Sequence, residues 1–186
     1  GSYHGKGSSP ISITIAGAEL PAVYGAFEST VETPENMTAV TISVKGDAAV
    51  ESLYGLFRTY CTGGVLIDTE ESVTIKSLYG LRSSTMDGDI TENINYNCDG
   101  NTFVTLATDG YYTGKAYTIN GDAVFNMNGA GISSVYIVQN GAVLSKTLTA
   151  KVTDSKVDNL CGVSQSAKVD GDVSLTFDGI SAVKDG

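Results

Sequence analysis

Paired carboxylates are the first side chains in this sequence that could do chemistry, because such pairs can bind calcium or act as acid and base. Four pairs stand close in the chain: Asp87/Asp89, Glu70/Glu71, Asp170/Asp172 and Asp154/Asp158. None has the spacing of a known calcium-binding loop, and an Asp-Gly step already has a backbone explanation as a turn. We therefore predict no metal site and no cofactor.

Nucleophilic catalysis needs a base beside the nucleophile. The single histidine, His4, lies in the first eight residues, which have the composition of an expression-tag remnant. No Ser/His/Asp or Cys/His set can be assembled without it. We therefore predict no catalytic residues and no enzymatic activity.

The charge of the chain limits its partners. Acidic residues outnumber basic ones 21 to 11, which gives a net charge of −10. Such a surface repels phosphate backbones and anionic lipid headgroups, so we expect no nucleic-acid partner. The sequence also has no apolar run of about 18 residues, so we expect no membrane insertion of this segment.

Three cysteines, Cys61, Cys98 and Cys161, follow no zinc-binding or disulfide-scaffold spacing. A disulfide needs Cα atoms within about 7 Å of each other. The repeat described next places the three at different positions of the coil, so we expect no disulfide among them. Cys98 falls on the inner face, where we expect it to be buried as a small apolar residue.

An internal repeat is the strongest signal in the sequence. Ser-Leu-Tyr-Gly-Leu occurs at Ser52 to Leu56 and again at Ser77 to Leu81, which is 25 residues later. The β-rich runs that precede these copies begin at Val40 and Val65 and have the same offset. A shared offset over two segments indicates a structural repeat.

A template with apolar residues at −5, −3, 0 and +3 identifies further copies. Position 0 of each copy is its anchor, and the anchors are Val23, Leu53, Leu78, Phe103, Val135, Leu160 and Ile180. The last copy consists of Leu175, Phe177, Ile180 and Val183. The two longest spacings predict insertions at Glu28 to Thr38 and at Asp109 to Thr118.

A period in the low to middle twenties is typical of one rung of a solenoid. The −5/−3 alternation indicates a strand with one buried face, and the three-residue step to the anchor fits a corner. We predict an all-β fold, a parallel β-helix (solenoid) of about six to seven rungs. The alternatives are an antiparallel β-sandwich and a leucine-rich-repeat-like solenoid, although the leucine register of the latter is absent.

The residue after each anchor should form a column along the solenoid, with members about 4.8 Å apart. These residues are Tyr24, Tyr54, Tyr79, Val104, Tyr136, Cys161 and Ser181. If the column faces outward, Tyr24, Tyr54, Tyr79 and Tyr136 could bind sugar rings or an apolar partner surface. The alternative is that the tyrosines only stack on one another and stabilise the repeat.

From about Ser12 to Val183 the pattern resembles right-handed parallel β-helices, such as autotransporter passengers and other bacterial surface adhesins. The resemblance implies an extracellular or bacterial cell-surface location. It also implies a secreted, non-catalytic module (adhesin, stalk or filament segment) for cell adhesion, which binds a host protein or glycan or self-associates. The alternative is a polysaccharide-active β-helix enzyme, a lyase or hydrolase. Clustering of Arg58, Arg82 and Asp87 in one cleft would favour that alternative.

The domain organisation follows from the same repeat. We expect residues 1–8 to be a disordered tag remnant and residues 9–186 to form a single solenoid domain. Within it, residues 9–39 form an N-terminal cap and first rung, and residues 40–186 form the repeated rungs. The last template copy would expose an open rung, so we expect a fragment of a longer protein, with the solenoid continuing beyond it.

Overall fold

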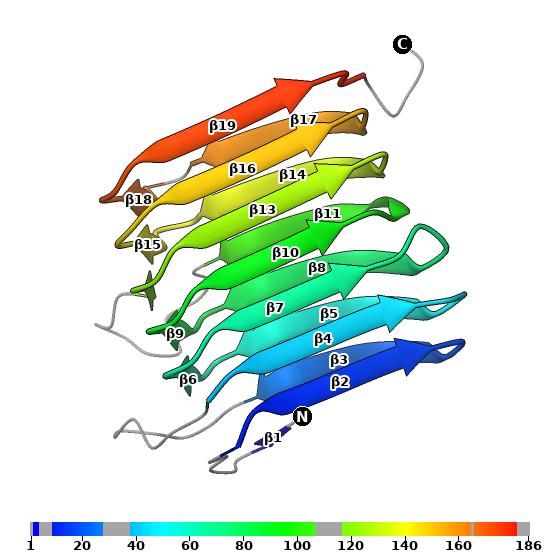
Figure 1. Cartoon of the computed structure of the whole chain (residues 1–186), viewed down its shortest axis with the longest axis horizontal. Coiled ribbons are helices and arrows are strands. Elements are labelled where there is room, and N and C mark those ends of the chain that lie inside the picture. The colour runs from blue at the N-terminus through cyan, green and yellow to red at the C-terminus, as the bar shows by residue number, and fades with distance from the viewer. Residues whose placement is uncertain (1, 4–8, 28–37, 107–116, 165, 182–186) are drawn as a thin grey trace.

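Residues with high β-propensity recur with each turn of the chain, and the backbone forms strands at each recurrence. The computed structural model describes residues 2–3, 9–27, 38–106, 117–164 and 166–181. Within these residues there is no helix, and three parallel sheets stack as a β-solenoid of about 6 turns (Figure 1). The predicted solenoid is therefore confirmed, and the antiparallel sandwich is excluded.

Two long sheets form the broad walls of the solenoid. Sheet A contains β1 (Ser2–Tyr3), β3 (Glu19–Phe27), β5 (Ala49–Phe57), β8 (Thr74–Arg82), β11 (Asn97–Leu106), β14 (Gly131–Gln139) and β17 (Lys156–Val163). Sheet B contains β2 (Ile11–Ala16), β4 (Val40–Lys45), β7 (Val65–Thr69), β10 (Ile90–Ile94), β13 (Ala123–Asn128), β16 (Leu148–Thr153) and β19 (Val173–Asp178).

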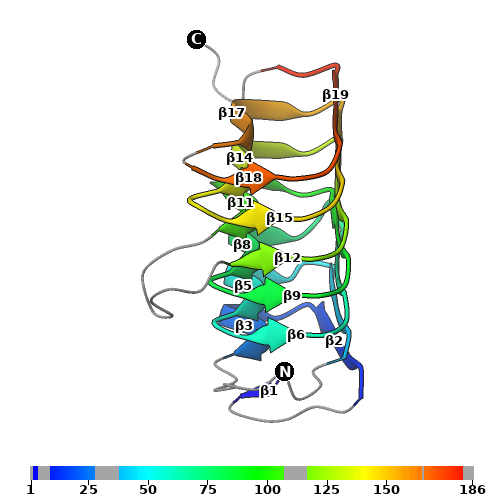
Figure 2. The same ribbon diagram turned by 90° about the vertical axis from the view of Figure 1, so that its left-hand side faces the viewer.

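A third sheet of two-residue strands closes the five turns that begin with β4, β7, β10, β13 and β16. Sheet C contains β6 (Tyr60–Cys61), β9 (Thr85–Met86), β12 (Thr118–Ile119), β15 (Val143–Leu144) and β18 (Lys168–Val169). Figure 2 shows these short strands one above the other, between the long strands of the two broad walls. Each of these five turns therefore runs from sheet B through sheet A and sheet C to the next strand of sheet B.

The strand register agrees with the sequence repeat in the three copies anchored at Val23, Leu53 and Leu78. Leu53 pairs with Leu78 and Tyr54 pairs with Tyr79, between β5 and β8. Val40 pairs with Val65 between β4 and β7. The 25-residue offset of the sequence is thus the offset of one turn.

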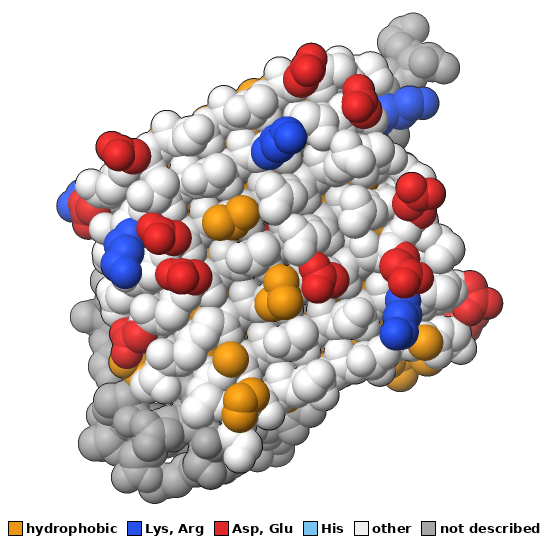
Figure 3. Space-filling model, in the orientation of Figure 1, with side chains coloured by type: hydrophobic (Ala, Val, Ile, Leu, Met, Phe, Trp, Pro, Cys, Tyr) orange, Lys and Arg blue, Asp and Glu red, His pale blue; other side chains and the backbone are white. Residues whose placement is uncertain are grey.

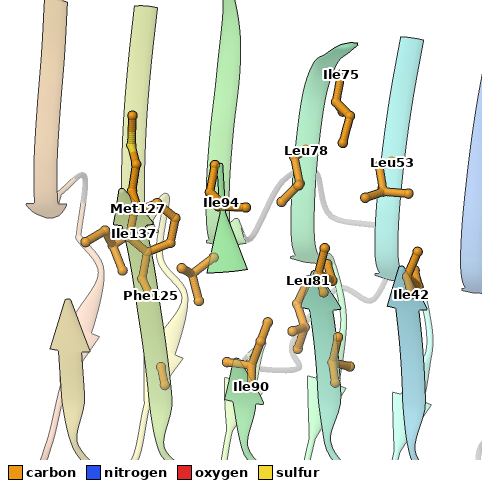
Figure 4. Packing of buried hydrophobic residues seen from close by; sticks show 14 of the residues in the cluster. Ile42, Leu53, Ile75, Leu78, Leu81, Ile90, Ile94, Phe125, Met127 and Ile137 are labelled. Carbon is orange, nitrogen blue, oxygen red and sulfur yellow. The ribbon is translucent and has the colours of Figure 1, made fainter. Parts of the chain in front are cut away.

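Apolar side chains from the sheets fill the interior. Ile42 in sheet B and Leu53, Leu78 and Leu81 in sheet A are fully buried. Figure 4 shows such residues between the strands of the facing sheets. Because each turn contributes the same columns, the interior is one continuous apolar cluster along the axis.

The predicted anchor Phe103 is wrong by one residue. Thr102, not Phe103, pairs with Leu78 on one side and Val135 on the other. Strand β11 has a register shift between Cys98 and Asn101. The polar Thr102 is completely buried at the anchor position, where its Oγ1 lies 3.1 Å from the hydroxyl of Tyr96. An apolar template cannot recognise a hydrogen-bonded threonine, so it selected the neighbouring phenylalanine.

The last template copy is also placed in the wrong sheet. Leu175 pairs with Ala150 and Phe177 with Val152, so both belong to β19 of sheet B. Ile180 is not an anchor, because the adjacent Ser181 pairs with Lys156 at the start of β17. Alternation of apolar residues is the same in sheets A and B, so the pattern alone did not distinguish them.

Several predictions fall largely on residues that the structure does not describe. These are most of the tag segment 1–8, the two insertions and Val183. Within the tag segment, Ser2 and Tyr3 form β1 and pair with Ala26 and Phe27. The insertions agree with the register, since Ile11 pairs with Val40 and Ile90 with Ala123, at offsets above 25 residues.

Candidate binding surface

The four predicted tyrosines lie in one column on the outer face of sheet A. Ring centroids are 4.9 Å apart for Tyr24 and Tyr54 and again for Tyr54 and Tyr79, with interplanar angles of 3° and 5°. Phe103 continues the stack at 5.0 Å from Tyr79, and Tyr136 follows at 5.4 Å from Phe103. Each of five consecutive turns thus contributes one aromatic ring, and the strand register stacks these rings into a ladder.

Of the other three predicted members of the column, two need correction and one is confirmed. Val104 is fully buried in the core, because the register shift in β11 places Phe103 in the column instead. Ser181 is not a member, since it pairs with Lys156. Cys161 pairs with Tyr136 and so follows the last ring of the ladder.

A second pair of rings lies beside the ladder. Phe27 and Phe57 stack on each other with centroids 5.2 Å apart and an interplanar angle of 4°. Each also packs against the tyrosine of its own strand, at 4.7 Å from Tyr24 and 5.1 Å from Tyr54. The outer face of sheet A is therefore continuously aromatic over its first turns.

Both arginines of the chain lie against these rings. The guanidinium carbon of Arg58 is 4.9 Å from the Phe57 ring centroid. That of Arg82 is 5.5 Å from Phe57 and 5.1 Å from Tyr79. Arg82 also donates a hydrogen bond of 3.3 Å from Nη1 to the hydroxyl of Tyr54. Cations over aromatic faces are attracted by the ring quadrupole, so the rings hold the guanidinium groups in place.

We call this surface the aromatic–arginine ridge. It consists of Tyr24, Phe27, Tyr54, Phe57, Arg58, Tyr79, Arg82, Phe103 and Tyr136. Tyr54 and Phe103 are buried at 8% exposure, whereas Tyr24, Phe57, Tyr79, Arg82 and Tyr136 are half-buried. The internal faces of the ladder are covered by neighbouring rings. The ridge can therefore offer ring edges and guanidinium groups to a partner, but few free ring faces.

The sequence signal for Phe57 and Arg82 was present but was not used. Both follow the repeated Leu-Tyr-Gly-Leu, so they occupy equivalent positions, and they pair with each other. The position of the repeat could have predicted that Arg82 lies over Phe57. That Arg58 approaches the same ring depends on the turn after β5, where its φ is 51°.

The opposite wall has a different character. Figure 3 shows the outer face of sheet B, where hydrophobic side chains are single and scattered among polar ones. Isolated apolar residues of this kind are ordinary on a protein surface. The concentration of rings on sheet A therefore distinguishes that face.

Asp87 and Asp89, at the corner before sheet B, accept hydrogen bonds from residues of neighbouring turns. Asp87 accepts hydrogen bonds from the hydroxyl of Tyr60 and, at 2.7 Å, from Nδ2 of Asn120. The bond to Asp87 raises the pKa of Tyr60 to about 12. Asp89 accepts from the backbone N–H of Asp122 at 2.8 Å. These contacts connect successive turns of the solenoid.

Two of the other acidic pairs, for which we expected no metal binding, also have members that contact residues of this chain. Glu70 accepts a hydrogen bond of 2.9 Å from the backbone N–H of Gly46, and Asp170 forms an ion pair of 2.5 Å with Lys168. Among the described residues, no three side chains of the metal-binding types come together.

The structure describes the side chains of two of the three cysteines, Cys61 and Cys161. Cys61 is fully buried, and its thiol donates to the backbone oxygen of Thr38 at 2.7 Å. Burial raises the pKa of this thiol to about 11. Cys161 is half-buried and is not in a disulfide. The predicted burial of Cys98 concerns a side chain outside the described part.

A buried acid was missed by the sequence analysis. Glu92 in β10 is fully buried, and neither of its carboxyl oxygens has a hydrogen-bond partner among the described residues. It pairs with Ile67 on one side and Phe125 on the other, so it lies in an apolar column of sheet B. Burial raises its pKa well above the usual range of a glutamate.

The residues named for the enzyme alternative come together only in part. Arg58 and Arg82 both pack against the Phe57 ring, whereas Asp87 contacts Tyr60 and Asn120. A groove of about 480 Å³ opens near the amino ends of β3, β5 and β8. Its lining includes Glu19, Pro21, Glu51, Thr74 and Lys76, and neither arginine is among the lining residues.

The sequence matches no protein-family model, no curated protein and no solved structure. The described residues form no helix that is long and apolar enough to cross a membrane.

Proposed function

We propose that this chain is a non-catalytic extracellular surface module that binds a protein partner through the aromatic–arginine ridge. The observation that carries the proposal is the position of Arg58 and Arg82 over Phe57 on the aromatic face of sheet A. Tyrosine, phenylalanine and arginine are the residue types enriched at protein–protein interfaces, and tyrosine and arginine dominate their binding energy.

The electrostatics of the chain support this site. The protein has a net charge of −10, yet both of its arginines pack against the same ring, that of Phe57. A guanidinium that is held against rings loses less side-chain entropy on binding than a mobile one. The ridge therefore suits a partner surface that presents carboxylates near apolar groups.

The backbone at the corner after β5 places Arg58 beside the ring of Phe57. Arg58 has a φ of 51°, and the equivalent residues of later turns, Ser83 and Asn140, have φ of 50° and 57°. The left-handed conformation is therefore a feature of this corner, and at Arg58 the guanidinium carbon lies 4.9 Å from the Phe57 ring centroid.

A glycan partner is less well supported by the geometry. Sugar rings bind proteins by packing against the free face of an aromatic ring. In the ladder, the rings of Tyr54, Tyr79 and Phe103 each have a neighbour on both faces, at centroid distances of 4.9 to 5.4 Å. A partner must instead contact ring edges and guanidinium groups, which favours a protein.

The test compares two double variants on arrays of purified extracellular proteins and glycans. Arg58→Gln with Arg82→Gln removes both charges of the ridge. Lys45→Gln with Lys151→Gln removes two charges from exposed positions on sheet B and serves as the matched control. We expect the parent to bind a protein, with at least about tenfold weaker binding by the arginine variant and unchanged binding by the control.

Three outcomes would overturn the proposal: no protein bound by the parent, equal loss of binding in both double variants, or binding to glycans alone. Thermal unfolding of each variant separates a loss of binding from a loss of fold.

A further inference from the structure

Glu92 lies directly behind one step of the aromatic ladder. Its Oε1 lies in front of Gly80, the residue that follows Tyr79 in β8. Val104 follows Phe103 in β11 and lies opposite Gly80, because the residues on either side of the two are paired. Successive residues of a strand point to opposite faces. The buried carboxyl group and the Tyr79–Phe103 step, whose rings are 5.0 Å apart, therefore lie on opposite faces of the same two strands.

Sheet A presents its backbone to the interior at this point. A β-carbon on Gly80 would lie 2.6 Å from the backbone oxygen of Val104, so only a glycine allows the two strands to pack in this way. A side chain of sheet B fills the space in front of the glycine. At the equivalent Gly25 of the first turn, that side chain is the apolar Ile42. Glu92 has the position of Ile42 two turns later, so an acid replaces an apolar residue there.

No charged side chain faces this carboxyl group within the described part of the chain. Its neighbours in sheet B are Ile67 and Phe125, and β13 has no titratable residue. The hydroxyl of Tyr96, in the same turn, lies 3.1 Å from Oγ1 of Thr102. The side chains of Cys98 and Asp99 on β11 are outside the description. The other titratable side chains of the adjacent strands lie on the outer faces: Asp68 of β7, and Lys76, Tyr79 and Arg82 of β8.

The surroundings of Glu92 favour the protonated carboxyl group. Among the described residues neither oxygen has a hydrogen-bond partner, and burial raises the pKa well above the usual range of a glutamate. Loss of the proton leaves a charge in an apolar interior, which is costly unless water reaches it. On the side of sheet A, the backbones of β8 and β11 lie between the carboxyl group and solvent. Hydration from this side requires these two strands to separate.

The contact between β8 and β11 is less regular than the contact between β5 and β8. Strand β5 pairs with β8 from Ala49 to Phe57, whereas β11 pairs with β8 from Asn101 to Leu106. Thr102 also occupies the anchor position that leucine fills in β5 and β8. Shorter pairing and less apolar packing lower the cost of a local opening. The step in front of the buried acid is therefore the one that opens most easily.

We propose that Glu92 is a proton switch for the aromatic–arginine ridge. With the proton bound, the step between Tyr79 and Phe103 is closed. When the proton is released to solvent, β8 and β11 separate and the ladder divides between these two rings. Arg82 packs against Tyr79, so it then loses its fixed position and the ridge binds its partner more weakly. This consequence for binding rests on the function proposed above, whereas the opening itself does not.

The direction of the pH dependence follows from linkage. In the open form the carboxyl group is in water, with a pKa of about 4.3. In the closed form its pKa is higher, because the group is buried. The closed form is therefore fully favoured below about pH 4.3, the pKa of a hydrated glutamate. From there, each additional pH unit lowers the ratio of closed to open form by about tenfold, until the pKa of the closed form is reached.

Aromatic NMR signals of the full chain test the opening, because stacked rings shift each other's resonances. The signals of Tyr79 and Phe103 are followed from about pH 4 to about pH 9, below the titration of tyrosine hydroxyls. In the parent, we expect both to move toward their unfolded-chain positions as pH rises. The signals of Tyr24, in the first turn, should stay in place. Glu92→Gln cannot titrate, so all three should stay in place in that variant.

Two further variants complete the test. Asp68→Asn is the matched control, because it removes an acid from the outer face of the neighbouring strand, and it should show the pH profile of the parent. Glu92→Met is a second variant without a titrating group, for use if Glu92→Gln does not fold. Ring signals of the parent that do not change with pH would overturn the proposal. So would equal movement of Tyr24, which would show unfolding of the whole chain, or the same profile in a folded Glu92 variant.

Binding tests the link to the ridge. For a protein that the parent binds, the affinity of the parent divided by that of Glu92→Gln should fall at least about tenfold over the same pH range. A constant ratio, despite movement of the ring signals, would overturn the link between Glu92 and the ridge. The ring signals require no partner. If no protein is bound, the binding proposal fails alone, and the opening is still tested by NMR.

Discussion

The carboxyl group of Glu92 occupies the space that a β-carbon on Gly80 would need. A β-carbon at this position would overlap Oε1 of Glu92 and would lie 2.5 Å from Cδ1 of Ile90 and 2.6 Å from the backbone oxygen of Val104. Gly80 is in β8 of sheet A and Glu92 is in β10 of sheet B. The missing side chain on one wall of the solenoid therefore leaves space for the carboxyl group from the other wall. The buried acid and the glycine form one packing unit.

Gly80→Ala should destabilise the protein, because the added methyl group meets atoms on three sides. Overpacking of this kind typically costs about 1–3 kcal/mol of unfolding free energy. Urea unfolding of the parent, Gly80→Ala, Glu92→Ala and the double variant gives the coupling between the two sites. We expect Gly80→Ala to cost less in the Glu92→Ala background, and strictly additive effects would contradict the direct contact.

Glu92 should make the protein less stable as pH rises. Burial raises the pKa of this carboxyl in the folded state, whereas in the unfolded chain it is about 4.3. The folded state therefore disfavours the charged form. No penalty exists below the unfolded pKa, and the penalty grows as pH rises from there until it levels off above the folded pKa.

Glu92→Gln removes this titration while keeping the shape of the side chain. The melting temperature of the variant minus that of the parent should therefore increase as pH is raised from about 4. Glu92→Met also removes both carboxyl oxygens, which have no hydrogen-bond partner within the described part of the chain. A buried polar group without a hydrogen bond costs about 1–3 kcal/mol. A difference in melting temperature that does not change with pH would show that the carboxyl is solvated in the folded state.

Loss of a ring from the middle of the ladder should cost more stability than loss of a ring at its end. Tyr79 stacks on Tyr54 and Phe103 and also lies under Arg82, whereas Tyr136 stacks on Phe103 alone within the ladder. Each stacked aromatic pair contributes about 0.5–1.5 kcal/mol beyond its buried area. In chemical denaturation, Tyr79→Ala should therefore lower the unfolding free energy by about 1–2 kcal/mol more than Tyr136→Ala does. Equal losses would show that the stacking itself contributes little.

The cysteines should differ in reactivity. Cys61 is fully buried with a pKa raised to about 11, so only about a thousandth of it is thiolate at about pH 8, whereas Cys161 is half-buried. We expect an alkylating reagent to modify Cys161 in the native protein and Cys61 only after unfolding. Peptide mass spectrometry with and without denaturant measures both rates. Equally fast modification of Cys61 in the native protein would contradict its buried position.

The sequence by itself determined the parallel solenoid and much of its outer column. The 25-residue recurrence of Leu-Tyr-Gly-Leu requires equivalent residues to stack, and Leu53 indeed pairs with Leu78 and Tyr54 with Tyr79. This information is local, since each strand has its own alternation of inward and outward residues. A repeat then fixes the register of neighbouring turns.

Only the tertiary structure decided the position of Phe103 in the ladder, the assignment of Leu175 to sheet B and the burial of Glu92. An apolar template cannot recognise a threonine that is satisfied by the Tyr96 hydroxyl, nor a buried acid that fits beside a glycine of the facing sheet. It also cannot distinguish two sheets with the same alternation. The direction of each side chain is encoded along the strand, but its neighbours depend on which turns and walls pack together.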